Sequence, residues 1–296
     1  MACLHRFVDL ARRSILRQDM VVGRRAWPSH PNRRSPIGDS APRRPRSRSR
    51  NGQERRMLTP RSEFPKSGAT TVAVVTGGHP FDVVGLHNLF RRLDSVNAYI
   101  QHYDDYIYDW GDVRTAYDVV IFYNFHREAP GSEQRIWRRP AREALLSLGE
   151  SKQGIIVLHH ALDAFPKWDF WSDLVGFDRM AWAAANDVQL HFDETIPITL
   201  VDPEHAITRG LDDFTIEGET WETPGVEDLG PYDDCHVLLA TDHPKQMPRQ
   251  LAWTREYREA RVLYLQPGHD LRSFEDINFR TILQRGIQWA AGRLPA

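Results

Sequence analysis

Three short, uninterrupted apolar runs constrain the fold of this chain more than any other feature. They are Thr71–Thr76, Asp118–Tyr123 and Gly154–Leu158, and they are rich in β-branched residues. Such runs are typical of strands that are buried on both faces of a sheet. Helix-patterned segments lie between them, at Val83–Leu93 and Glu133–Leu148. Strands that alternate with helices predict an α/β fold built on a doubly wound, mostly parallel sheet with helices on both faces.

The second half of the chain continues the same pattern. Further strands are predicted at Ile196–Val201, His236–Thr241 and Arg261–Gln266. Asp82 is placed to cap the first helix. The last helix is expected to start at a Ser273 cap and to end at Gly292, with one apolar face made of Phe279, Ile282, Leu283, Ile287 and Ala290.

Charge divides the sequence into two regions. Residues 1–70 contain seventeen Lys and Arg against five Asp and Glu, whereas the remainder is acidic. An acidic body argues against nucleic-acid binding by the folded domain. No run of eighteen apolar residues occurs, which predicts no membrane span. Two distant cysteines form no disulfide framework and favour a reducing, cytoplasmic location.

Residues 1–69 are expected to form a disordered extension rich in Arg, Pro and Ser, ahead of one domain at 70–296. Three interpretations stay open for this extension. It resembles an organelle transit peptide. It also suits a basic arm for nucleic acid or anionic membrane. The third interpretation is that translation starts at Met57.

Histidines follow every predicted strand. In open α/β sheets, ligands bind beyond the carboxyl ends of the strands, where such residues would gather. Imidazoles and carboxylates at one edge can bind a divalent metal or act as acid and base near neutral pH. Loop exposure is the better explanation for any single histidine, but the set of His79, His159 and His269 favours a site. The polar residues at the strand ends are Gly78, His79, Asn124, His126, His159, His160, Asp202, His205, Asp242, His243, His269 and Asp270.

Two further signals are weaker. Glu217, Glu219 and Glu222 lie around Trp221, and a carboxylate beside an aromatic ring suits a sugar hydroxyl, although such a run is more often a solvated face. Gly77-Gly78 lacks the Lys-Ser/Thr of a P-loop and the spacing of a dinucleotide fingerprint, so no nucleotide is expected.

Several of these segments together resemble the ThuA-like (trehalose-utilisation) family. The resemblance covers nearly all of residues 70–294. It is carried by Val72-Ala-Val-Val-Thr-Gly-Gly-His79, Tyr117-Asp-Val-Val-Ile-Phe-Tyr-Asn124, Gly154-Ile-Ile-Val-Leu-His-His-Ala161, Asp202-Pro-Glu-His-Ala-Ile-Thr-Arg-Gly-Leu211, Gln266-Pro-Gly-His-Asp270 and Gly286-Ile-Gln-Trp-Ala-Ala-Gly292.

The resemblance implies a flavodoxin-like fold of the class I glutamine amidotransferase type. Those enzymes carry a nucleophilic cysteine on the turn where this chain has His159-His160. The nearest cysteine, Cys235, is far along the chain and is expected to be a passive, buried residue, so amidotransferase chemistry is excluded. Many relatives have a second histidine in the first loop, where this chain has Pro80 and Phe81.

The resemblance also implies a role in the use of trehalose, related disaccharides or keto-sugars. The leading hypothesis is an enzyme, a sugar-directed hydrolase or isomerase, with His159, His269 and Asp270 as catalytic residues. Asp270 would orient an imidazole, and zinc or manganese would bind at His79, His159 and His269. The remaining expected ligand-binding residues are Gly78, His79, Asn124, His160, Glu219 and Trp221, with Trp221 as a stacking wall.

Two other classes of function remain open. One is a non-catalytic binding or regulatory module on an amidotransferase-like scaffold, because one fold hosts many functions. The other is a structural subunit of a homo-oligomer. In the leading hypothesis the partner is a small sugar or sugar derivative, with no membrane and no nucleic acid at the domain.

Overall fold

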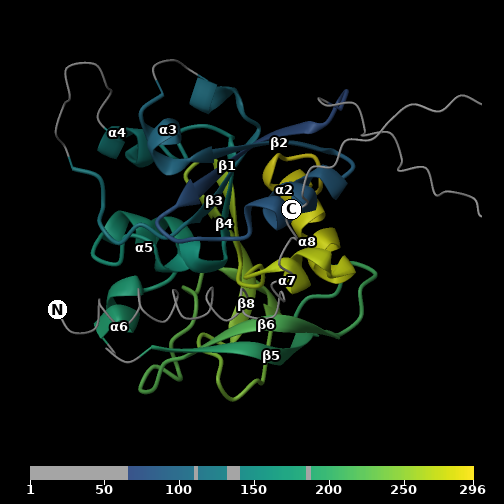
Figure 1. The fold of residues 1–296 in the computed structure, drawn as a ribbon. Coiled ribbons are helices and arrows are strands. Elements are labelled where there is room, and N and C mark those ends of the chain that lie inside the picture. Colours follow the sequence, from purple (N-terminus) through teal and green to yellow (C-terminus); the bar gives the residue numbers. More distant parts are fainter. Residues whose placement is uncertain (1–65, 110–112, 132–140, 185–187) are drawn as a thin grey trace, which may run out of the picture. The chain divides into compact units, whose positions relative to one another are not determined.

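The computed structural model describes residues 66–109, 113–131, 141–184 and 188–296. The predictions for residues 1–65 and 133–140 lie outside these ranges. The described residues form a nine-stranded sheet with the order β2-β1-β3-β4-β9-β8-β7-β5-β6 (Figure 1). The strands are β1 Thr70–Gly77, β2 Val96–His102, β3 Val119–Asn124, β4 Gly154–Leu158, β5 Gln189–Leu200, β6 Phe214–Glu222, β7 His236–Ala240, β8 Gln250–Tyr257 and β9 Ala260–Leu265.

The sheet is mixed. Strands β2, β1, β3, β4 and β9 pair in parallel, whereas β8, β7, β5 and β6 add to β9 by antiparallel pairing. The α/β class is therefore confirmed, but the expected mostly parallel sheet is corrected to one with an antiparallel half. Sequence patterns anticipated the six strands with apolar runs and missed β2, β6 and β8.

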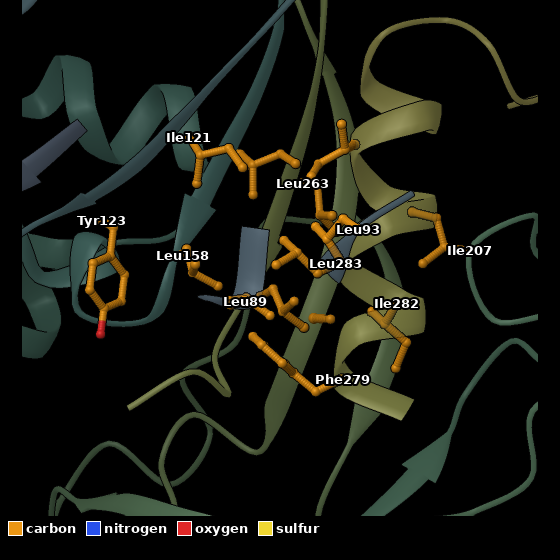
Figure 2. Close-up of a cluster of buried hydrophobic side chains, with 14 of the residues drawn as sticks. Leu89, Leu93, Ile121, Tyr123, Leu158, Ile207, Leu263, Phe279, Ile282 and Leu283 are labelled. Carbon is orange, nitrogen blue, oxygen red and sulfur yellow. The ribbon is translucent and has the colours of Figure 1, made fainter. Parts of the chain in front are cut away.

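Helices cover both faces of the sheet (Figure 1). They are α2 Val83–Arg92, α3 Tyr103–Ile107, α4 Ala141–Leu146, α5 Asp169–Val175, α6 Arg179–Ala184, α7 Leu271–Glu275 and α8 Ile277–Ala290, together with the 3₁₀ turns η1 Val113–Ala116 and η2 His159–Asp163. Val72 and Val74 pack with α2 and α8, and Figure 2 shows part of that core. Ala73 and Val75 point the other way and pack with α3, α4 and α5. This alternation is the period of two of a strand.

Two helix ends test the predicted caps. The Asp82 carboxylate accepts a hydrogen bond from the backbone N–H of Gly85 at 2.9 Å, which confirms the first cap. The last helix, however, is capped by Asp276, which accepts from Phe279 N–H at 2.7 Å. Ser273 lies in the separate short helix α7, because Asp276 has extended backbone angles that interrupt the helical run. Gly292, with φ of +70°, follows the end of α8 as expected.

Strand direction decides which loops share an edge of the sheet. β5 runs opposite to β9, so its carboxyl end lies at the other edge. His205, which follows β5, contacts His236 at the start of β7, with ring centroids 5.7 Å apart. Asp202 and His205 are therefore removed from the edge where the other histidines gather. Among the described residues, no helix is long and apolar enough to cross a membrane.

Candidate functional site

Four side chains meet at the carboxyl edge of the parallel strands. His159 and His160 open the η2 turn after β4, Glu219 lies on β6, and His269 follows β9. One nitrogen or oxygen atom from each of them falls within 4.8 Å of the corresponding atoms of the others. The donors are three imidazoles and a carboxylate, which are the ligand types that zinc binds in proteins.

His159 is held in a fixed tautomer. It sits on the sharp turn after β4 with φ of +54° and is fully buried. Its Nδ1–H donates to the backbone carbonyl of Gln266 at 2.8 Å, which leaves the lone pair on Nε2. That atom lies 3.3 Å from Nδ1 of His269. Burial holds the pKa of His159 well below its usual value, so the ring is neutral and its lone pair is available at neutral pH.

Glu219 links the two other imidazoles. Its Oε1 lies 3.4 Å from Nε2 of His160, and its Oε2 lies 2.8 Å from Nδ1 of His269. The indole N–H of Trp221 also donates to Oε1. Burial alone would raise the pKa of this carboxyl, but His160 and His269 outweigh burial and hold the pKa well below its usual range. Glu219 is therefore a buried carboxylate anion.

His269 is the nearest partner of that carboxylate. Burial opposes its charge, yet the neighbouring Glu219 carboxylate is stronger and raises the pKa of His269 above its ordinary value. Glu219 and His269 thus form a buried pair in which the carboxylate favours the protonated imidazole. A divalent cation would compete with that proton, because metal binding to imidazole requires the unprotonated ring.

Two of the four side chains are accessible from solvent. The side chains of His160 and His269 are 14% and 22% exposed, whereas Glu219 is enclosed. Aromatic rings surround the opening. Phe125 lies 5.2 Å from His160, and Phe192 of the β5 bulge lies 5.4 Å from His269, measured between ring centroids.

His79 lies beside the four residues but outside the ligand set. Its Nδ1–H donates to the carbonyl of Pro80 at 2.9 Å, and its ring stands edge-on to His160 with centroids 5.4 Å apart. Burial, followed by the charge of His160, lowers the pKa of His79 to about 4. The structure therefore supplies His160 and Glu219 as candidate metal ligands in place of His79.

Asp270 and Trp221 differ from expectation. Asp270 caps α7 and pairs with Arg272 at 2.6 Å, so the carboxylate that orients His269 is Glu219. The sequence spacing favoured Asp270 because it is the neighbour of His269 along the chain. Trp221 is only 1% exposed and stacks between His160 and Trp182, so it supports His160 and offers no open face for stacking on a sugar.

Gly78 and Asn124 lie at the ends of β1 and β3. Gly78 has φ of +82°, and a Cβ there would lie 2.5 Å from the carbonyl carbon of Phe125. It therefore allows the first loop to pass close to the second. Asn124 is buried, and its amide nitrogen lies 3.3 Å from Nδ1 of His126. Among the described residues, no hydrogen bond joins Asn124 to Glu219 or His269.

Cys235 is partly exposed rather than buried. Burial of its sulfur nevertheless raises the pKa of the thiol to about 11, so it holds little thiolate at neutral pH. Sequence reasoning missed the Gln266 carbonyl, Trp182 and Phe192. Gln266 directly precedes the Pro-Gly-His269 turn, but no residue pattern identifies a backbone carbonyl as a hydrogen-bond acceptor for a distant histidine.

Comparisons with solved structures find proteins that share this fold. The chain is similar in structure to a protein described as ThuA-like from Parabacteroides merdae (14% identity, TM-score 0.55, covering 75% of this chain and 90% of that one). It is also similar to one from Bacteroides uniformis (17%, 0.54, covering 77% and 94%). A cytoplasmic protein from Salmonella typhimurium shares the fold at 9% identity (TM-score 0.51, covering 74% and 99%).

At these identities the structural likeness shows the fold alone. No protein of curated function matches the sequence. The sequence pattern of the ThuA family, described as trehalose utilisation, matches residues 95–290. That match spans β2 to the end of α8 and includes all four clustered residues. The chain therefore belongs to the ThuA family.

Proposed function

We propose that this protein is a cation-dependent enzyme of carbohydrate utilisation that acts on a sugar or keto-sugar. The observation that carries the proposal is the convergence of His159, His160, Glu219 and His269 within 4.8 Å at the carboxyl edge of the sheet. Zinc is the preferred cation because three imidazoles and a carboxylate suit it, and manganese is the alternative. The sugar class is inferred from the family description, trehalose utilisation.

The donor set fits such a cation. His159 presents a lone pair on Nε2 because Gln266 holds the other ring nitrogen, which is how ligating histidines are commonly oriented in proteins. Glu219 is held in its ionised form and His159 in its neutral form, as metal ligands must be. A bound cation would polarise a substrate carbonyl or lower the pKa of a bound water. His79, which is neutral, lines the wall next to His160.

The scaffold supports the same assignment. We infer that the parallel half of the sheet is a flavodoxin-like, doubly wound unit of the glutamine amidotransferase type. The order β2-β1-β3-β4-β9 is the flavodoxin-like order 2-1-3-4-5, and apolar cores lie on both faces. In this alignment His159 occupies the turn that holds the cysteine in amidotransferases, and the thiol of Cys235 is elsewhere and poorly ionised. We place the enzyme in the cytoplasm, since a structural relative is described as a cytoplasmic protein.

Metal analysis of the full-length chain, purified without a histidine tag, tests the proposal. We expect close to one zinc or manganese ion per chain, lost in His159→Ala and Glu219→Gln. His236→Ala is the matched control, because His236 also pairs with a carboxylate, at 2.8 Å from Asp202, but lies at the opposite edge of the sheet. Equal metal content in all four proteins, or none in the wild type, would remove the cation from the proposal.

Activity provides the second test. The metal-loaded protein would be assayed against trehalose, related disaccharides and their keto derivatives, with product formation measured by mass spectrometry. We expect turnover by the wild type and by His236→Ala and its loss in His159→Ala. Specific sugar binding without turnover would instead indicate a binding module.

A further inference from the structure

We propose that Asp163, Arg127 and Arg179 form a clamp that fixes the ring of His160 in place, and that they are positioning residues for the site. The inference rests on the proposed function, in which His160 is one of the four ligands. The His160 side chain lies at the open side of the site and is partly exposed to solvent. Burial alone therefore does not fix its orientation. Its ring lies between the rings of Phe125 and Trp221, and each of these is connected to Asp163 through an arginine.

The first arm of the clamp runs through Phe125. The Arg127 guanidinium donates to the Asp163 carboxylate at 2.6 Å and to the Asp163 backbone carbonyl at 2.9 Å. The same guanidinium lies over the Phe125 ring, 5.0 Å from its centroid. Phe125 in turn lies 5.2 Å from the His160 ring. Arg127 therefore grips the end of the η2 turn and one neighbour of His160 at the same time.

The second arm runs through two tryptophans. Arg179 is 2% exposed and pairs with the other oxygen of Asp163. Its guanidinium lies 4.4 Å from the ring of Trp182, which stacks on Trp221 with centroids 5.6 Å apart. The Trp221 ring stacks in turn on the His160 ring, with centroids 5.4 Å apart and only 10° between the ring planes.

Both arms of the clamp meet at Asp163, and the backbone also links Asp163 to His160. Asp163 ends η2, three residues after His160, so the carboxylate that joins the two arginines is covalently tied to the histidine that their aromatic partners hold. A buried ion pair is not needed for stability, since apolar residues of similar size often stabilise a fold as well or better. Here each oxygen of the Asp163 carboxylate meets a different guanidinium, which instead defines where each partner lies.

The clamp predicts a specific defect when Arg127 is replaced. Arg127→Met leaves Asp163 paired with the buried Arg179, so the fold is expected to persist. The zinc-loaded full-length variant would be challenged with excess chelator and its zinc release followed with a chromogenic indicator. Groups that orient metal ligands are worth about 10- to 100-fold in affinity, so we expect release at least about 10-fold faster than in the wild type. Arg127→Lys, which keeps the charge but lacks the planar fork, should restore part of the difference.

Arg258→Met is the matched control. Arg258 is similarly exposed, donates to the carbonyls of Leu146 and Leu148 and lies 5.1 Å from the Tyr257 ring, but it precedes β9 at the opposite edge of the sheet. Its variant should release zinc like the wild type. Equal release from Arg127→Met and the wild type would overturn the clamp, and faster release from both variants would show a general loss of stability instead.

A readout without metal separates this inference from the proposed function. In the metal-free wild type, the ring protons of His160 should resonate upfield in NMR because Trp221 and Phe125 lie against its ring; His160→Gln assigns the signals. Arg127→Met should move these signals toward those of a free histidine. If the wild type binds no zinc but the signals move, the clamp stands and the cation does not. Unmoved signals would overturn the clamp whatever the metal result.

Discussion

Acid should destabilise this fold partly through His79. The pKa of His79 is lowered to about 4 in the folded chain, mainly by burial, whereas an unfolded histidine titrates near 6.5. Above pH 6.5 the ring is neutral in both states and contributes no pH dependence. As the pH falls below 6.5, the unfolded chain takes up the proton first, so the free energy of unfolding falls until the folded ring also titrates.

The size of the effect follows from the two pKa values. Each pH unit between them corresponds to about 1.4 kcal/mol, so the loss at pH 4.5 is about 2.5 kcal/mol for this residue. His79→Gln removes the titrating group. Between pH 7.5 and pH 4.5 it should therefore lose about 2.5 kcal/mol less stability than the wild type.

Urea unfolding at both pH values, with chelator present, measures how much less stability the variant loses than the wild type. Contributions from titrating groups that do not interact with His79 cancel in this comparison. His87→Gln on α2 is the control, because His87 is much less buried and its pKa is less perturbed. The reasoning is refuted if the wild type and His79→Gln lose the same stability over this interval, since the unfolded and folded states would then bind the proton equally.

Three other predictions concern single residues. Glu219→Gln should move the pKa of His269 from above to below its ordinary value, because burial is then opposed only by weaker charges; NMR titration of His269 in metal-free protein checks this, and an unchanged pKa would contradict the pairing. Gly78→Ala should cost at least about 2 kcal/mol in chemical denaturation, since left-handed strain adds to a clash with Phe125. Gly210→Ala, with φ of +75° and open space around it, should show the strain alone, and equal losses would refute the clash. Cys235, with a thiol pKa raised to about 11 by burial, should alkylate about 100-fold more slowly at pH 8 than in the unfolded chain, as followed by peptide mass spectrometry; equal rates would show that the thiol is free to ionise.

Much of the parallel half could be predicted from sequence. Buried parallel strands require continuous apolar runs, and those runs mark β1, β3, β4 and β9. The rule that ligands gather at the carboxyl ends of such strands then placed His159, His160 and His269 at one edge. These three residues needed only local pattern and strand direction.

The rest of the site depends on pairing that no local pattern specifies. β6 alternates polar and apolar residues only over its first half, and its polar residues Glu219 and Thr220 are buried. No apolar run therefore marks this strand, and its partner and register are set by long-range packing. The sequence predicts Glu219 as a ligand-binding residue because it lies close to Trp221, but its contact with His269 follows from the position of β6 in the sheet. Likewise, Asp202 and His205 were placed at the site because the direction of β5 could not be derived from its composition.

The central place of β9 has a consequence for the order in which the molecule assembles. Without β9, the strands fall into two groups, β2-β1-β3-β4 and β8-β7-β5-β6, and no strand of one group pairs with a strand of the other. His159 and His160 belong to the first group and Glu219 to the second, and His269 directly follows β9 itself. A ribosome must therefore deliver nearly the whole chain before the four residues can meet. Contacts so distant in sequence form slowly, so the site should be among the last features of the protein to mature, and a nascent chain should be unable to capture its ligand early.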